Sequence, residues 1–112
     1  MNHLKVKKIV INIFKNFKLK EAHAEISAEY LIKAELLGAP SHGLSRLKMY
    51  CERLNKKIIN PNPKIKIKKI SQSISHIDAN NGIGFVGADL GIKTAIKNAK
   101  KTGIGLVAVK NS

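Results

Sequence analysis

Four side chains suited to proton transfer or anion binding lie close together between residues 41 and 50. Ser41 and His42 are adjacent, and Arg46 follows His42 by four residues. Tyr50 follows Arg46 by four more. A serine hydroxyl beside an imidazole can fix the tautomer, so that the other ring nitrogen gives or takes a proton near neutral pH. An arginine one turn away can bind a carboxylate with two parallel hydrogen bonds.

This combination suits a small 2-hydroxy or 2-oxo acid, with Arg46 holding the acid group and His42 addressing the adjacent oxygen. Each residue also has an ordinary structural explanation. Ser41 is a favoured N-cap residue, and a histidine in a first turn is often a solvated surface residue. Arg46 and Tyr50 can form a solvated helix face, with the arginine stacked on the ring. Spacing alone leaves both interpretations open.

A helix from Ser41 to about Asn55 is predicted to position these side chains, because residues four apart are neighbours on a helix. The buried stripe is expected at Leu44, Leu47, Cys51 and Leu54. A preceding helix is predicted over residues 20–37, where apolar residues follow helical spacing at Ile26, Tyr30, Ala34 and Leu37. Gly38 and Pro40 are expected to end it.

Two prolines in the stretch Asn60–Pro63 forbid a continued helix and divide the chain. We predict an N-terminal helical segment over 1–59, which carries the Ser-His-Gly motif. The start of an α/β nucleotide-binding or catalytic region is predicted over 60–112. There we expect a strand at 64–68 with one solvent-exposed face and a second strand at 74–78. A helix at 87–101 and a buried strand at 104–109 should follow. The side chains of this helix expected to point inward are Ala88, Ile92, Ala95, Ile96 and Ala99, and Gly103 is expected to end the helix. The fold class is therefore mixed α+β, with helices followed by strand, strand, helix and strand.

A G-x-G-x-x-G pattern at Gly82, Gly84 and Gly87 resembles the phosphate-binding turn of a dinucleotide domain. The carboxylate that should follow about 20 residues later is absent, since no Asp or Glu follows Asp89. We interpret the pattern as a glycine-rich turn before a helix and do not predict a Rossmann domain.

The net charge of +14, from 21 basic and 7 acidic residues, is typical of nucleic-acid-binding proteins. The lysines are scattered from Lys5 to Lys110, however, and aromatic residues make up only 4%. A small basic nucleic-acid-binding module is therefore the alternative function, and nucleic acid is not the partner we expect.

No apolar run approaches a membrane span, no cleavage site follows the N-terminal apolar patch, and Cys51 is the single cysteine. We expect a cytoplasmic protein without a membrane partner.

The segment from Ala34 to Leu47 (AELLGAPSHGLSRL), followed by Tyr50, Arg53 and Ile59–Pro61, resembles the N-terminal signature of the malate/L-lactate dehydrogenase family. Asp78–Gly84 (DANNGIG) and Gly103–Ser112 (GIGLVAVKNS) continue the resemblance in the same order. The resemblance covers almost the whole chain, and its Ser-His-Gly segment with the arginine is a specific marker.

The resemblance implies an NAD- or NADP-dependent oxidoreductase for small 2-hydroxy acids, working as a homodimer on an L-sulfolactate dehydrogenase-like fold. Ser41 and His42 would form a proton-relay pair, Arg46 would bind the substrate carboxylate, and Tyr50 would contribute to the substrate site. Asn111 and Ser112 would begin a motif that leads to a catalytic histidine. We assign no cofactor-binding residues and expect no metal.

Members of this family are much longer than 112 residues. We therefore expect the chain to be an N-terminal fragment that is inactive by itself. The predicted strand at 104–109 would then form an unfinished sheet edge.

Overall fold

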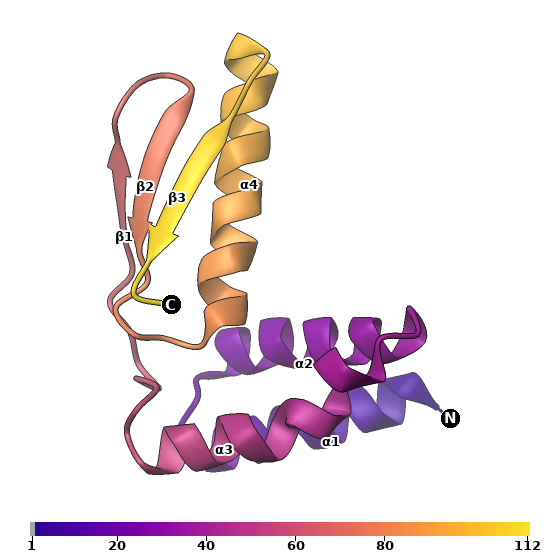
Figure 1. Ribbon diagram of the computed structural model, residues 1–112. Coiled ribbons are helices and arrows are strands. Elements are labelled where there is room, and N and C mark those ends of the chain that lie inside the picture. The colour runs from indigo at the N-terminus through magenta and orange to yellow at the C-terminus, as the bar shows by residue number, and fades with distance from the viewer. Residues whose placement is uncertain (1) are drawn as a thin grey trace. The chain divides into compact units, whose positions relative to one another are not determined.

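The computed structural model describes residues 2–112, which form two compact units, the first reaching to Asn62 and the second running from Pro63 to Ser112 (Figure 1). The first unit is helical, and the second contains the sheet and one long helix. This arrangement confirms the predicted mixed α+β class. The assignment of 1–59 and 60–112 to separate domains stays a prediction.

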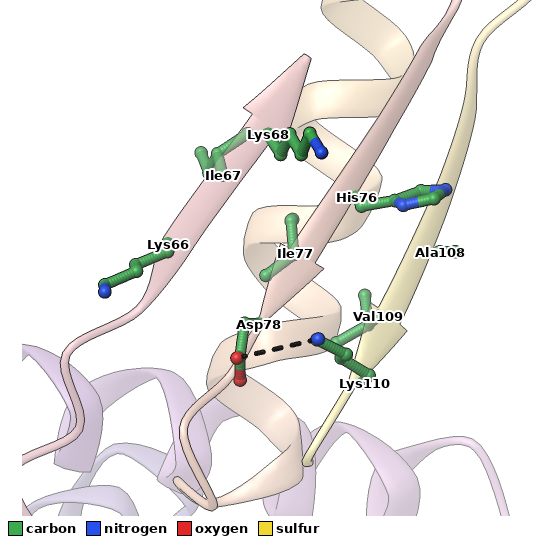
Figure 2. A pocket seen from close by; sticks show the side chains of 9 residues that line it. All are labelled: Lys66, Ile67, Lys68, His76, Ile77, Asp78, Ala108, Val109 and Lys110. Carbon is green, nitrogen blue, oxygen red and sulfur yellow. Dashed lines mark ion pairs between the residues drawn. The ribbon is translucent and has the colours of Figure 1, made fainter. Parts of the chain in front are cut away.

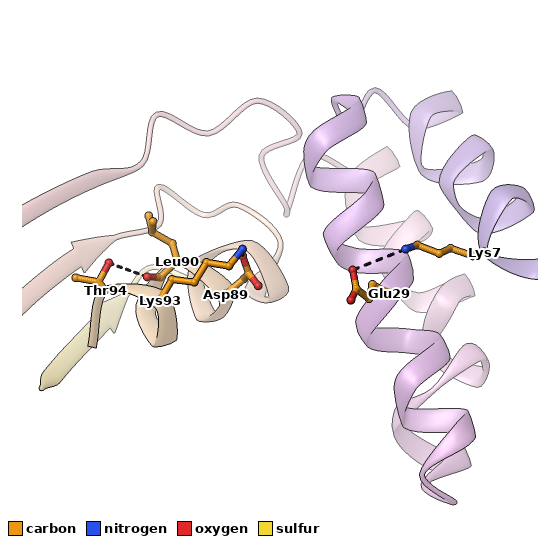
Figure 3. A network of polar contacts seen from close by, with 6 residues as sticks. All are labelled: Lys7, Glu29, Asp89, Leu90, Lys93 and Thr94. Carbon is orange, nitrogen blue, oxygen red and sulfur yellow. Dashed lines mark hydrogen bonds and ion pairs between the residues drawn. The ribbon is translucent and has the colours of Figure 1, made fainter. Parts of the chain in front are cut away.

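The first unit is built from three α-helices and two short 3₁₀ turns. In chain order these are α1 (His3–Asn16), α2 (Glu21–Leu36), η1 (Pro40–His42), η2 (Leu44–Arg46) and α3 (Leu47–Asn55). Helix α1, to which the sequence analysis gave no bounds, begins after Asn2, whose side chain accepts a hydrogen bond from the Lys5 N–H at 3.3 Å. It packs along α2, and an ion pair of 3.7 Å between Lys7 and Glu29 joins the two helices (Figure 3).

The core of this unit lies between α1, α2 and α3. The apolar side chains that are almost completely buried include Val10, Phe14, Ala24, Ala28, Leu31, Ile32, Cys51 and Leu54. The predicted helix over 20–37 is confirmed as α2, and Gly38 follows it in the left-handed conformation with φ +78°. Its buried face differs from the residues singled out in the sequence, because Leu37 is 74% exposed and Ile26, Tyr30 and Ala34 are only half-buried.

The predicted helix from Ser41 to Asn55 is wrong over its first six residues. Two single 3₁₀ turns occupy residues 40–46, and the α-helix begins only at Leu47. Between the two turns Gly43 has φ −100° and ψ −137°, which is not a helical conformation and stops any helix. Ser41 is therefore not the N-cap of α3.

The second unit is a three-stranded sheet with one helix. Its elements are β1 (Lys66–Lys69), β2 (Ile74–Asp78), α4 (Gly84–Thr102) and β3 (Leu106–Lys110). The strand order is β1-β2-β3, with β1 antiparallel and β3 parallel to β2, so α4 is the crossover that parallel pairing requires. Asp89 and Lys93 form an ion pair of 2.7 Å along α4, and Thr94 Oγ1 donates to the Leu90 carbonyl at 2.7 Å (Figure 3).

Helix α4 packs on the sheet through small residues and not through the predicted apolar stripe. Ile92 and Ile96 are 53% and 48% exposed, and Ala88 is exposed as well, so these three were wrongly predicted to point inward. The buried positions on the helix are instead Val86, Gly87 and Gly91. A Cβ atom on Gly91 would lie 3.2 Å from Val109 Cγ2, so the absence of a side chain allows this close approach of helix and strand.

The outer strands differ from prediction in exposure. All four residues of β1 are exposed, although only one face of this strand was expected to be exposed to solvent. Strand β3 alternates between exposed and half-buried residues and is not the predicted buried strand, because it lies at the edge of the sheet within residues 2–112. Gly103 ends α4 as predicted, with φ +88° and its N–H bonded to the Ala99 carbonyl at 2.7 Å.

Candidate active site

The predicted site residues lie in the loop of residues 40–46, hereafter the Pro40–Arg46 loop, which begins as α2 ends. The αL conformation of Gly38 lets the Ala39 N–H reach back to the Ala34 carbonyl at 2.9 Å, which closes the end of the helix. Pro40 then starts the first 3₁₀ turn, where the absence of an N–H is harmless.

A carboxylate from α2 fixes the middle of the Pro40–Arg46 loop. Glu35 Oε1 accepts a hydrogen bond from the Leu44 N–H at 2.8 Å. Gly43 is buried against the same side chain, and a Cβ atom at this position would overlap Glu35 Oε1 and lie 2.8 Å from Glu35 Cδ. An alanine at 43 would therefore have to push aside the Glu35 carboxylate, which is the flexible end of that side chain.

Two further hydrogen bonds close the loop on itself. Ser45 Oγ donates to the Pro40 carbonyl, and Arg46 Nε donates to the Ser41 carbonyl, each at 2.7 Å. Both bonds span five residues and join the second 3₁₀ turn to the first. The arginine is thereby held against the segment that carries the histidine.

His42 and Arg46 are brought together through Ser41, although not as two positions on one α-helix. Ser41 Oγ lies 3.0 Å from His42 Nδ1, and the Ser41 carbonyl accepts from Arg46 Nε. Ser41, His42 and Arg46 are all exposed. Tyr50 lies apart from the loop in α3 and is half-buried.

A model of the malate/L-lactate dehydrogenase family matches residues 1–112. The chain belongs to the malate/L-lactate dehydrogenase family. L-Sulfolactate dehydrogenase of Methanocaldococcus jannaschii is 40% identical over 106 residues, which are 95% of this chain and 31% of the relative. Ureidoglycolate dehydrogenase (NAD(+)) of Escherichia coli is 34% identical over 91 residues, which are 81% of this chain and 26% of the relative.

Solved structures within this family have the same fold. Malate dehydrogenase from Pyrococcus horikoshii superposes with a TM-score of 0.94 at 34% identity, covering 98% of this chain and 32% of that structure. The chain thus spans about a third of the length of the relatives it matches. No helix among residues 2–112 is long and apolar enough to cross a membrane.

Two glycines of the pattern before α4, Gly82 and Gly87, are packed against the protein, whereas no atom lies within 4 Å of a Cβ added to Gly84. A Cβ on Gly82 would lie 2.7 Å from Pro63 Cγ, and one on Gly87 would lie 3.1 Å from Ala79 Cβ. These glycines therefore accommodate neighbouring protein atoms and leave no close approach for a ligand. We assign neither of them to the nicotinamide nucleotide.

Hydrogen bonds tie this turn to the end of β3. Asp78 Oδ1 accepts from the Asn80 N–H and from Asn111 Nδ2, each at 3.0 Å. These two bonds, and secondarily the charges of Lys110 and Lys66, lower the pKa of Asp78. Asn111, which follows β3, is therefore anchored by a carboxylate that stays ionised.

A hollow of about 610 Å³ lies over the sheet of the second unit (Figure 2). Two rows of paired residues contribute to its lining, namely Lys66, Asp78 and Lys110 in one row and Lys68, His76 and Ala108 in the next. The ion pair drawn in Figure 2 joins Asp78 and Lys110 at 4.0 Å. The basic side chains carry positive charge, but the carboxylate is already hydrogen-bonded within the protein. We assign no reaction to this hollow.

Two reactive residue types in the first unit are buried away from the loop. Burial, and secondarily the charge of Lys20, lowers the pKa of His23, whose Nδ1 has no hydrogen-bond partner among the described residues. Burial also raises the pKa of the Cys51 thiol, so the thiol stays protonated and is a poor nucleophile. Both side chains are structural.

Sequence reasoning missed Glu35 and Ser45. One signal for Glu35 was available, since a carboxylate in the last turn of a helix opposes the helix dipole and needs a compensating partner. The partner itself, the Leu44 N–H nine residues later, could be recognised only once the break at Gly43 was known. Ser45 carried no signal, because its bond depends on the two 3₁₀ turns.

Proposed function

We propose that this chain supplies the acid-binding and proton-transferring side chains of an NAD- or NADP-dependent dehydrogenase of small 2-hydroxy acids. The observation that carries the proposal is that Ser41 is bonded to both functional groups, to His42 through its hydroxyl and to Arg46 through its carbonyl. Both groups are exposed and can reach a metabolite. Membership of the malate/L-lactate dehydrogenase family supports the substrate class.

Arg46 would bind the substrate carboxylate through its two terminal nitrogens. Its Nε is already used in the bond to the Ser41 carbonyl. A planar guanidinium held by Nε still presents the two terminal N–H groups that can bind a carboxylate in parallel. The acid group is thus expected to meet the end of the arginine and not its side. Tyr50 is proposed as a secondary contact of the substrate.

His42 would remove the proton of the substrate hydroxyl with Nε2. This role requires the tautomer in which Nδ1–H donates to Ser41 Oγ, leaving a lone pair on Nε2. When Nε2 accepts the proton, the Nδ1 proton can pass to Ser41 Oγ while the serine hydroxyl releases its own proton to solvent, since Ser41 is exposed. This coupled transfer makes the pair a relay. The carbon-bound hydrogen leaves as hydride, which is the chemistry that NAD or NADP supplies, and a 2-oxo acid remains.

The family likeness also supports three further proposals. We propose a homodimer, a cytoplasmic location, and a role for Asn111 and Ser112 at the start of a segment that completes the active site. Sedimentation of the purified protein tests the first, because a monomer at all concentrations contradicts it.

The function is tested by exchanging this chain for the matching third of M. jannaschii L-sulfolactate dehydrogenase and measuring nucleotide reduction with sulfolactate and malate. His42→Ala should lower kcat by roughly a hundredfold or more, the usual contribution of a general base. Arg46→Lys should mainly raise KM, by roughly ten- to a hundredfold, through loss of a charged bidentate contact. A folded hybrid that is active, and whose turnover survives His42→Ala unchanged, contradicts the proposal.

A further inference from the structure

Glu35 is a half-buried carboxylate in the last turn of α2, where the helix dipole disfavours negative charge. A carboxylate is retained in such a place only if a specific contact offsets the cost. The contact here is the 2.8 Å hydrogen bond from the Leu44 N–H. The Glu35 carboxylate at the end of α2 therefore has its hydrogen-bond partner, the Leu44 N–H, in the Pro40–Arg46 loop.

The same carboxylate determines where that loop bends. The space in which Gly43 would carry a Cβ is filled by Glu35 Oε1, Cδ and Cγ. Gly43 has a non-helical backbone conformation between the turn that carries His42 and the turn that carries Arg46. Since glycine has an unusually broad range of backbone conformations, a bond to the next residue is needed to select one of them.

We propose that Glu35 is a positioning residue for His42 and Arg46, acting by fixing the Gly43–Leu44 backbone between them. The inference rests on the proposed function insofar as it treats His42 and Arg46 as working groups. Without the Glu35 bond, the Ser45 and Arg46 bonds would still join the two 3₁₀ turns, but the Gly43–Leu44 backbone between them would lose its hydrogen bond to α2. The Arg46 Nε bond to the Ser41 carbonyl should then weaken.

The proposal is tested by nuclear magnetic resonance on the whole chain without substrate, comparing Glu35→Gln with Glu35→Leu. Glutamine keeps an oxygen acceptor at the same position, whereas leucine has a similar size and no acceptor. Glu25→Leu, an exposed substitution on the same helix, is the matched control. The readouts are the solvent exchange rate of the Arg46 Nε–H and the chemical shifts of the His42 ring nitrogens.

In Glu35→Leu we expect Arg46 Nε–H exchange to accelerate on the order of tenfold and the His42 shifts to move toward those of a free imidazole. Glu35→Gln should largely keep the wild-type values, and Glu25→Leu should keep them fully. Rescue by glutamine separates positioning from a general loss of helix stability. Unchanged His42 and Arg46 signals in a folded Glu35→Leu protein overturn the proposal.

A second pair of variants covers the case in which Glu35→Leu fails to fold. Gly43→Ala in the wild type should disturb the same signals, because the new methyl group displaces the Glu35 side chain. In the Glu35→Ala background the space is vacant, so Gly43→Ala should add less than a twofold further change. Equal effects of Gly43→Ala in both backgrounds overturn the proposal. Because no substrate is present, these results stand apart from the proposed function, which fails only if substrate assays fail.

Discussion

Gly43 and Gly82 each precede a helical segment, yet their surroundings have opposite chemical character. The missing side chain of Gly43 makes room for a carboxylate, and Ser41, His42, Ser45 and Arg46 in the same loop are exposed and polar. The missing side chain of Gly82 makes room for Pro63, and the turn is tied into the sheet by hydrogen bonds. A glycine in a motif thus indicates that other atoms approach its backbone closely. Whether the glycine serves a functional site or only packing depends on which residue those atoms belong to.

The largest effect should come from Gly82→Ala in the second unit. The new methyl group would meet Pro63 Cγ at 2.7 Å, and neither the proline ring nor the nearby Ala79 carbonyl can move easily. We expect the free energy of unfolding to fall by about 2–3 kcal/mol, as for other overpacking substitutions. Chemical denaturation of the chain gives the value.

Gly84→Ala is the matched control for that substitution. Gly84 begins α4 and has no heavy atom within 4 Å of an added Cβ, so alanine should leave stability unchanged or raise it by up to about 1 kcal/mol. Equal losses for the two variants would show that steric crowding at 82 is not the reason for its glycine.

Mild acid should distinguish the first unit from the second. The pKa of His23 is lowered from 6.5 in the folded chain, so below 6.5 the unfolded chain binds the proton first and the free energy of unfolding declines. Hydrogen exchange of α1 and α2 amides should therefore accelerate between about pH 7 and 5. His23→Leu should remove this dependence, while His3→Gln, on the exposed surface, should keep it. An unaltered pH profile in His23→Leu would refute the assignment.

Stronger acid should affect the second unit through Asp78. Its pKa is lowered from 3.8 by the bonds from Asn111 and Asn80, so the stabilisation is present above 3.8 and is lost as pH falls through the folded pKa. Amides of β2 and β3 should lose protection in that window. Asp78→Asn should flatten the decline, and Glu52→Gln on the first unit should not. A decline of the same steepness in Asp78→Asn counts against this role of the carboxylate.

Ser45→Ala should give the smallest effect. The Ser45 Oγ bond to the Pro40 carbonyl is exposed, so its loss should cost roughly 0.5–1 kcal/mol. The variant is expected to loosen the Pro40–Arg46 loop locally and to leave β2 and β3 unchanged, as amide exchange can show. Loosening of the sheet as well would contradict the separation between the two units.

The sequence was sufficient to predict α2, the ends of two helices and the order of strands and helix in the second unit. Glycine in the left-handed conformation explains that success at Gly38 and Gly103, since few other residues tolerate it. Periodicity failed on α4, because Gly87 and Gly91 face the sheet while Ile92 and Ile96 remain exposed. A pattern of apolar residues does not reveal that a helix packs through its glycines.

The sequence was sufficient to select the candidate site residues but not to predict the backbone conformation that carries them. Spacing predicted that an α-helix aligns His42 and Arg46, but that helix does not extend to residues 40–46. The structure instead links each of the two residues to Ser41, and a carboxylate from another helix binds the loop, which no local pattern contains. The catalytic and substrate roles of Ser41, His42, Arg46 and Tyr50 stay predictions.

The most direct test of the account is a titration of the chain with L-malate, followed through the resonances of Arg46 and His42. We predict saturable shifts of the Arg46 terminal N–H groups and the His42 ring nitrogens, with the Arg46 Nε–H remaining bonded to the Ser41 carbonyl. The uncharged diamide of malate should produce no such shifts, because it lacks the carboxylate. Shifts spread over surface lysines, with none at Arg46 or His42, would contradict the claim that this loop binds a small 2-hydroxy acid.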